Sequence, residues 1–204
     1  QRSGSRGKGI QPRTLEVYDD LGVIGAVHEA GGPYTPALAW EGPKAVGPAK
    51  FHRIERRDPT PDVPYPSMWM LPQPRPVGIL RKQLAERGGR VEFGTRLVSF
   101  EQDGDGVAVT LRDSNDRQED VRIRYLAGCD GAHSTVRKHA GIPFEGGAYP
   151  QEFALGDVEA DGLELGAIHA FGAGRGFAMF FPLGHPRTWR VMAMEAGGPR
   201  AVDD

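Results

Sequence analysis

Short runs in which apolar and polar residues alternate dominate residues 91–126, and such alternation is typical of half-buried β-strands. Polar and glycine-rich turns separate the runs, as in consecutive hairpins. The predicted strands cover residues 91–93, 97–101, 107–112 and 121–126, with turns at 103–106 and 113–117. This part of the chain is therefore predicted to form a β meander.

Two earlier stretches have helical spacing instead. Pro12 suits the first turn of a helix that runs to residue 21, with Leu15, Tyr18 and Leu21 on one face and Gly22 as its end. A second helix is predicted over residues 77–87, ended by Gly88 and Gly89.

The remaining regions predict strands without helices. Residues 31–66 are rich in proline and glycine and are interpreted as irregular strands, including 37–40. After Pro143 the strand-like runs are 152–158, 167–171, 176–182 and 188–195, with a hairpin loop at 183–187. Phe177, Met179 and Phe181 alternate on one face, and we interpret them as core residues rather than as a pocket lining.

Composition narrows the classes of protein that fit this pattern. The chain has 204 residues, 39% of them hydrophobic and 25% charged, and a net charge of −2. Acidic and basic residues are interspersed, so no basic stripe for nucleic acid is present. Apolar runs are too short for a membrane span, and the first residues carry no signal-peptide core. We therefore expect a cytoplasmic protein with neither nucleic-acid nor membrane partners.

The residues from Tyr125 to Arg137 predict a ligand site. They read as a buried strand, a tight turn at Asp130-Gly131 and a short helix over residues 135–140 that Ser134 caps. Exposed backbone N–H groups at such a strand-to-helix turn favour an anion, and Arg137 adds positive charge. Asp130 would instead accept hydrogen bonds from ribose or ribityl hydroxyls. From these residues alone, a plain connection with a solvated aspartate is an equal alternative.

The sequence gives weaker signals for a metal site or a catalytic nucleophile than for the ligand site at residues 125–137. Six histidines are scattered without metal-ligand spacing, so no metal site is predicted. His133 is interpreted as a solvent-facing loop residue, and Ser134 lacks a nucleophile elbow. The single cysteine, Cys129, is interpreted as a small packing residue.

Three blocks, in the same order along the chain, resemble the FAD-dependent aromatic hydroxylases, the single-component flavoprotein monooxygenases typified by p-hydroxybenzoate hydroxylase. Cys129-Asp-Gly-Ala-His-Ser-Thr-Val-Arg137, with the following residues 141–146, is similar to that family's Asp-Gly motif. Residues 6–23 resemble the segment in which an arginine contacts the flavin nucleotide before a helix. Residues 70–75 and 79–84 resemble the block whose glutamine touches FAD at a helix start.

The resemblance implies an α/β fold: part of a Rossmann-like FAD-binding domain with a β meander, interwoven with a β-sheet substrate domain. The FAD-binding part would comprise residues 1–26 and 69–143, and the substrate part residues 27–68 and 144–204. FAD would be positioned by Arg6, Gln73, Asp130 and Arg137. NADPH or NADH would be the reductant, and molecular oxygen and a small aromatic compound the substrates. Because the cofactor carries the chemistry, no catalytic residue is assigned.

Some of that family's features are missing from these residues. There is no Gly-x-Gly-x-x-Gly strand unit and no later Gly-Asp motif, and Pro76-Val77 stand where the family often has Thr-Glu. We therefore expect an internal fragment that by itself holds no FAD, is inactive and tends to self-associate. Two alternatives stay open: another flavoprotein of this fold, such as a halogenase or epoxidase, and a non-enzymatic β-rich binding module.

Overall fold

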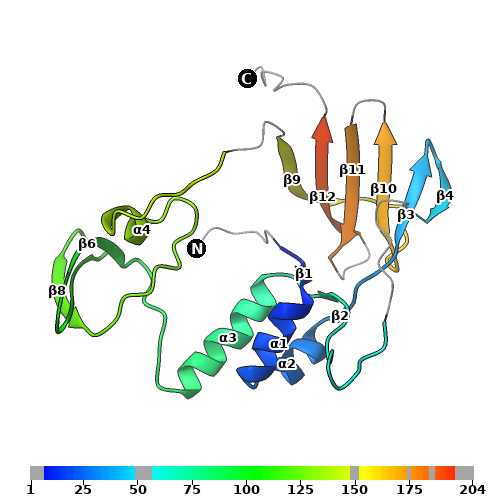
Figure 1. Cartoon of the computed structure of the whole chain (residues 1–204). Coiled ribbons are helices and arrows are strands. Elements are labelled where there is room, and N and C mark those ends of the chain that lie inside the picture. Colours follow the sequence, from blue (N-terminus) through cyan, green and yellow to red (C-terminus); the bar gives the residue numbers. More distant parts are fainter. Residues whose placement is uncertain (1–6, 49–56, 148–151, 174–175, 184–186, 196–204) are drawn as a thin grey trace. The chain divides into compact units, whose positions relative to one another are not determined.

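The protein is mixed α/β and forms two compact units. The computed structural model describes residues 7–48, 57–147, 152–173, 176–183 and 187–195 (Figure 1). One unit comprises residues 90–148, and the other comprises residues 2–89 together with residues 149–204. Helices and three β-sheets occur together among the described residues, which confirms the predicted fold class.

The unit of residues 90–148 is built on the predicted meander. Its antiparallel strands are β6 (Arg96–Asp103), β7 (Gly106–Arg112) and β8 (Gln118–Ile123). Val107 and Val109 of β7 are buried. The short helix α4 (Thr135–His139) contacts β6, where the rings of Phe100 and His139 lie 5.9 Å apart. Two hairpins and a packed helix thus position the loop before α4.

Two strand predictions in this unit are wrong. Residues 91–93 form no strand, and Phe93 is 62% exposed. The last strand ends at Ile123 rather than at residue 126, because Ile123 pairs with Val107 and β7 has already reached its turn at Gly106. Without a partner strand, Tyr125 is 89% exposed, so the segment before the Asp-Gly turn is not the buried strand that we predicted.

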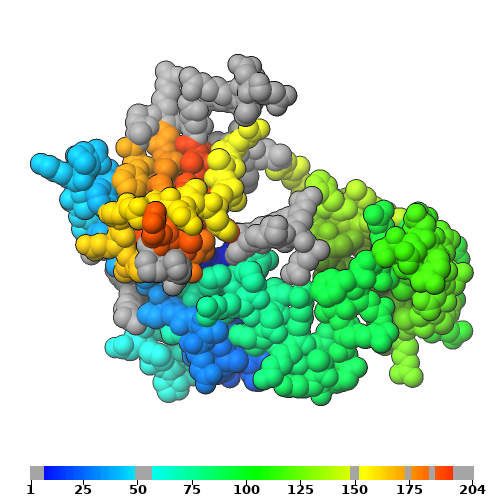
Figure 2. Space-filling view, turned by 180° about the vertical axis from the view of Figure 1, so that it is seen from behind, coloured from blue at the N-terminus to red at the C-terminus, as the bar shows by residue number. Residues whose placement is uncertain are grey.

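Three helices lie on one side of the larger unit (Figure 1). They are α1 (Pro12–Asp20), α2 (Ile24–Ala30) and α3 (Pro74–Glu86). The predicted α1 is confirmed, α3 begins three residues before its predicted start, and α2 was not predicted. Figure 2 shows these helices, blue to blue-green, packed side by side.

A small antiparallel sheet lies beside the helices. Its order is β1 (Gly9–Ile10), β5 (Trp69–Met70) and β2 (Gly32–Pro33). The pairing of β1 with β5 continues beyond the strands, since the Leu71 N–H donates to the Lys8 carbonyl at 2.7 Å. Ile10, Leu15, Val27 and Leu71 form one core cluster between this sheet and the helices.

A six-stranded sheet forms the rest of the larger unit. Its order is β4 (Lys44–Pro48), β3 (Ala37–Glu41), β10 (Ile168–Ala173), β11 (Gly176–Pro182), β12 (Thr188–Glu195) and β9 (Phe153–Glu159). The β3–β10 pair is parallel and the other pairs are antiparallel. All four strands predicted after Pro143 are confirmed. The 183–187 hairpin loop is partly outside the described residues, although the β11–β12 pairing confirms the hairpin.

The second core cluster lies on this sheet. Ile168 and Met179 are buried in it, and Phe177 and Phe181 pack against it, which confirms the interpretation of that alternating stripe as core. His169 is fully buried but satisfied: its Nδ1 accepts from Trp40 Nε1 at 2.9 Å, so its Nε2–H donates to the Glu164 carbonyl at 2.8 Å. His169 is therefore a structural residue.

Candidate functional site

Two features of the structure are candidates for ligand binding: the turn before α4 in one unit, and a pocket in the other. The turn depends on two glycines. Gly131 has φ +79°, a left-handed conformation that favours glycine. A Cβ on Gly128 would lie 2.7 Å from the Cβ of Val136, so only glycine lets this segment pass so close to α4. The predicted tight Asp-Gly turn is confirmed.

Asp130 and Ser134 cap α4 together. Ser134 Oγ accepts from the Arg137 N–H at 2.9 Å and donates to Asp130 Oδ1. Asp130 Oδ2 accepts from the N–H groups of Thr135 at 2.5 Å and Val136 at 3.3 Å. The hydrogen bond from Ser134, with those backbone donors, lowers the pKa of Asp130. The predicted Ser134 cap is thus confirmed, and Asp130 is an ionised acceptor that also serves the helix.

Arg137 is held within the same loop. Its guanidinium donates to the carbonyls of Ile142 at 3.2 Å and Ala132 at 3.3 Å, and lies 4.8 Å from the centroid of the Phe144 ring. Its Nε is buried without a hydrogen-bond partner among the described residues. The structure therefore brings Asp130 and Arg137 to one turn, with Arg137 as a fixed positive charge.

The chemistry of this turn fits a nucleotide. The Asp130 carboxylate is exposed as well as ionised, so a ligand hydroxyl can reach it as a further hydrogen-bond donor. Nothing lies within 4 Å of the position where a Cβ of Gly131 would stand, which leaves open space beside the backbone. A hydroxyl acceptor, a cation and an open glycine backbone are suitable partners for a ribityl or phosphate group.

The other predicted site residues have different positions. Gln73 is exposed at the N-cap of α3, as predicted for the start of a helix, and its N–H donates to the Gly7 carbonyl at 3.1 Å. Arg6 lies outside the described residues. His133 is exposed, which confirms its interpretation as a loop residue. Cys129 is exposed too, so the interpretation of Cys129 as a packing residue is wrong, because the strand meant to bury it does not form.

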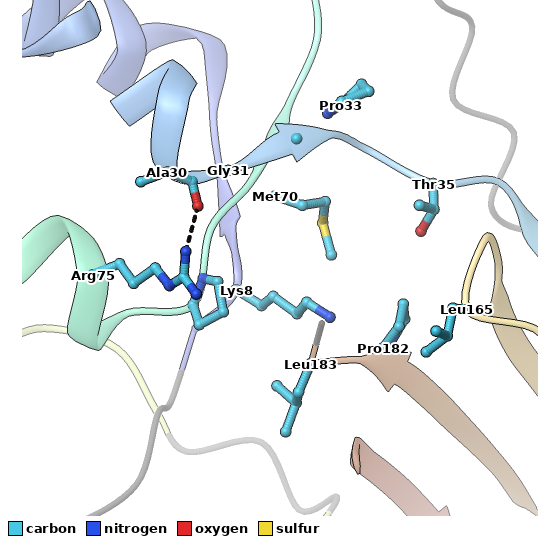
Figure 3. Close-up of a pocket in the computed structure, with 12 residues that line it drawn as sticks. Lys8, Ala30, Gly31, Pro33, Thr35, Met70, Arg75, Leu165, Pro182 and Leu183 are labelled. Atoms are coloured by element: carbon cyan, nitrogen blue, oxygen red, sulfur yellow. Dashed lines mark hydrogen bonds between the residues drawn. The ribbon is translucent and has the colours of Figure 1, made fainter. Parts of the chain in front are cut away.

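The pocket lies in the larger unit, between the helical side and the end of β11, where Leu165, Pro182 and Leu183 line it (Figure 3). It has a cavity volume of about 370 Å³. Its apolar walls include Met70, Pro72, Leu165, Pro182 and Leu183. Lys8 extends from the start of β1 toward Pro182 and Leu183, and Arg75 donates to the Ala30 carbonyl at 3.0 Å (Figure 3). A mostly apolar cavity with a few polar groups is a typical small-molecule site.

Lys8 has an unusual environment in this pocket. Burial, and to a smaller extent the positive charge of Arg190, lower the pKa of its ammonium to about 8. Arg190 is itself neutralised by Asp157, with Nε to Oδ1 at 2.5 Å and Nη2 to Oδ2 at 2.9 Å. Among the described residues, Lys8 Nζ is buried without a hydrogen-bond partner.

Sequence reasoning did not single out Lys8, although one signal was present. Residues two apart on a strand share a face, so Lys8 lies on the face of the buried Ile10. A lysine in register with a core residue, three positions before the N-cap Gln11, is such a signal.

The described residues offer neither a metal site nor a membrane-spanning helix. Within the described ranges, no three or more His, Cys, Asp or Glu side chains are grouped so that they could hold a metal ion. None of the helices in those ranges is long and apolar enough to cross a membrane.

Known proteins with similar sequences and structures include flavin-dependent monooxygenases. A flavin-dependent monooxygenase of Mycobacteroides abscessus is 41% identical over 169 residues, which cover 81% of this chain and 35% of the relative. The crystal structure of the flavin-dependent monooxygenase PieE with FAD and substrate matches with a TM-score of 0.75 at 25% identity, covering all of this chain and 38% of PieE. The aromatic hydroxylase CabE matches with a TM-score of 0.68 at 26% identity, covering all of this chain and 39% of CabE.

A family model matches a larger part of this chain than the Mycobacteroides abscessus relative does. The chain spans about a third of the length of the curated relatives that it matches. The model of the FAD binding domain matches residues 1–201, which is nearly the whole chain. This chain therefore belongs to the FAD binding domain family, and its relatives include a flavin-dependent monooxygenase.

Proposed function

We propose that the whole protein is an FAD-dependent monooxygenase that hydroxylates a small aromatic, phenolic compound with NADPH or NADH as reductant and molecular oxygen as co-substrate. The observation that carries this proposal is the match of the FAD binding domain over residues 1–201. Two features of the structure support it: the capped Asp-Gly turn, and a cavity whose size and apolar walls suit an aromatic ring.

Four residues would hold the cofactor. Asp130 would accept a hydrogen bond from a ribose or ribityl hydroxyl through its exposed carboxylate, and Arg137 would supply positive charge near a phosphate. Arg6 and Gln73 are assigned to the same task from the sequence resemblance. When bound, FAD supplies the redox and oxygen-transfer chemistry, which explains why no acid, base or nucleophile of this chain is assigned to it.

The chain's own contribution to the reaction would be a dry, shaped cavity. Met70, Pro72 and Leu183 present apolar surface to a ligand and exclude water from it. In the proposed division of the chain, residues 1–26 and 69–143 serve the cofactor and residues 27–68 and 144–204 serve the substrate. The pocket draws on both sets, since Lys8 and Arg75 belong to the first and Thr35 and Leu183 to the second.

Cofactor retention and reductant consumption test this function. The whole protein is purified, incubated with FAD and passed through gel filtration, and its visible spectrum is recorded. Oxidation of NADPH and of NADH is then followed with and without a panel of phenols. We expect a flavin spectrum and phenol-stimulated oxidation. A colourless protein would refute the proposal, and stimulation that requires halide or an alkene would indicate a halogenase or an epoxidase instead.

A further inference from the structure

Two polar side-chain atoms in the pocket lack partners within the described part of the chain. Lys8 Nζ and Thr35 Oγ1 are both buried without a hydrogen bond, and both residues line the cavity. An unpaired buried hydroxyl is costly and an unpaired buried charge more so, so proteins seldom keep either without a reason. Their presence in one cavity indicates a missing polar partner.

The charges around Lys8 define that partner. The charged residues among those lining the pocket are Lys8 and Arg75, with no acidic side chain in the lining. Outside the lining, the positive charge of Arg190 on β12 acts on Lys8, and Arg190 is paired with Asp157 of β9. The described surroundings thus supply positive charge to the cavity and no carboxylate for Lys8, so a negatively charged ligand is the matching occupant.

The walls define the rest of the ligand. Met70, Pro72, Leu165, Pro182 and Leu183 line the cavity with apolar surface, and its volume of about 370 Å³ is within the range of pockets for small organic molecules. Gly31 and Gly32 leave one wall without side chains. A flat ring can lie against such walls while one polar substituent reaches the lysine.

We propose that this pocket binds an aromatic ligand through an anionic oxygen, a phenolate or a carboxylate, which pairs with the Lys8 ammonium and accepts a hydrogen bond from the Thr35 hydroxyl. The inference rests on the proposed function, because it names the acidic arenes as the substrate class of that site. Lys8 is then a positioning and specificity-determining residue. Its four-carbon stem is flexible, so small rotations bring Nζ onto the ligand oxygen.

Binding of simple probes tests this inference without flavin or turnover. Affinities of the protein for 2-naphthoate and for the neutral 2-naphthamide are measured by calorimetry, and 2-naphthol tests the phenolate form. Lys8→Met keeps the length of the side chain and removes its charge. We expect Lys8→Met to weaken 2-naphthoate binding by about tenfold or more, as for loss of a charge-assisted hydrogen bond, and to change 2-naphthamide binding by less than about twofold.

Three further variants separate a charge effect from damage to the fold. Lys8→Arg keeps the charge and should retain most of the 2-naphthoate affinity, and Thr35→Val should weaken it by a smaller factor. Lys82→Met is the matched control, because Lys82 is exposed on α3 with its Nζ 3.9 Å from Glu86. Lys82→Met should bind both probes like the original protein. Thermal melting checks that each variant is folded.

The pH dependence of probe binding is a second readout. Because the pKa of Lys8 is about 8, its ammonium loses its proton above that pH, whereas Arg75 and Arg190 keep theirs. The 2-naphthoate affinity should therefore fall between about pH 7 and pH 9.5, and should stay flat in Lys8→Arg. For 2-naphthol, ionisation of the phenol raises the affinity over the same range until Lys8 is neutral.

The outcomes distinguish this inference from the proposed function. Equal 2-naphthoate affinity in Lys8→Met and the original protein would overturn the inference, even if FAD binds and arenes are oxidised. Loss of FAD binding in Lys8→Met with unchanged 2-naphthoate binding would also overturn it and assign Lys8 to the cofactor. A charge-dependent 2-naphthoate site in a protein that holds no FAD would support the pocket and refute the oxygenase function.

Discussion

Asp130 has two tasks at a single residue. Both of its oxygens accept hydrogen bonds from the start of α4, and in the proposed site the exposed carboxylate also accepts from a hydroxyl of FAD. A substitution at Asp130 therefore disturbs the helix cap as well as the ligand contact. The two effects are separable, because Ser134 shares the cap and is buried, away from a ligand.

Replacing Asp130 by alanine is expected to weaken FAD binding to the whole protein by on the order of tenfold, through loss of a charge-assisted hydrogen bond. Ser134→Ala removes the side chain that bonds both Asp130 and the Arg137 N–H, and should change FAD affinity far less. Flavin fluorescence titration measures both affinities. If the two variants lose the same affinity, Asp130 acts only through the cap.

Prediction from sequence at the residue scale succeeded where local chemistry decides the outcome. The Ser134 cap and the turn at Gly131 follow from the conformations that these residues favour. The burial of Lys8 could not be predicted in the same way, because it depends on Leu165, Pro182 and Leu183, which are more than 150 residues away along the chain. Such long-range packing leaves little trace in local sequence.

At the scale of elements, an ion pair joins the last two strands of the six-stranded sheet. Arg190 of β12 is paired directly opposite Asp157 of β9, and the Arg190 side chain is 9% exposed, compared with 47% for Asp157. The guanidinium binds the carboxylate through two nitrogens, which lowers the pKa of Asp157. The pair thus fixes β9 at the edge of the sheet.

Asp157→Asn should lower the free energy of unfolding by about 1–2 kcal/mol, because it leaves a nearly buried arginine without its counter-ion. The loss is smaller than for a fully buried pair, since water screens the exposed side of Asp157. Asp161→Asn is the control, because Asp161 pairs with Arg187 at the surface at 3.0 Å, and should cost less than about 0.5 kcal/mol.

The same prediction has a pH dependence with a defined sign. The pKa of Asp157 is lower in the folded protein than the value of 3.8 for an unperturbed aspartate. The ionised carboxylate therefore stabilises the folded state fully at pH values above 3.8. This contribution is lost as the pH falls from 3.8 through the lower pKa of the folded state. The stability difference between the original protein and Asp157→Asn should therefore be full at neutral pH and shrink below pH 3.8. Urea unfolding at several pH values measures it, and a difference that grows in acid would contradict this assignment.

Helices and strands with clear sequence patterns were predicted more accurately than those with weak patterns. β11 and β12 alternate clearly and were predicted at their observed bounds, whereas α2 has only seven residues, contains Gly25 and has Val23 at its N-cap without a side-chain hydrogen bond. Short helices with such weak helix-forming and capping signals depend on tertiary packing for their stability. In α2 that packing comes from Val27, which is 1% exposed and whose carbonyl accepts from Trp69 Nε1.

At the scale of the whole molecule, apolar side chains remain exposed in both units. Tyr125 is 89% and Phe144 67% exposed in the first, and the edge strand β9 carries Phe153 at 50% and Leu155 at 59% in the second. A sheet edge with apolar side chains and unpaired backbone groups favours association with another chain.

We expect these 204 residues alone to form species larger than their 22.1 kDa mass, and the charge substitution Leu155→Lys to reduce that association. Size-exclusion chromatography with light scattering measures the mass over a concentration series. The exposed charge substitution Glu152→Lys at the same end of β9 serves as the control. A monomer at all concentrations would show that the exposed apolar residues do not drive association.

The proposed function makes one central claim about the whole protein, namely that it inserts an oxygen atom from molecular oxygen into an aromatic ring. The most direct measurement is turnover of an acidic arene that stimulates NAD(P)H oxidation, under ¹⁸O₂ in ordinary water, with mass spectrometry of the product. We predict a hydroxylated product that carries one ¹⁸O atom, and no label when the heavy isotope is supplied as water. A product labelled from water, or reductant oxidation without any oxygenated product, would contradict the account.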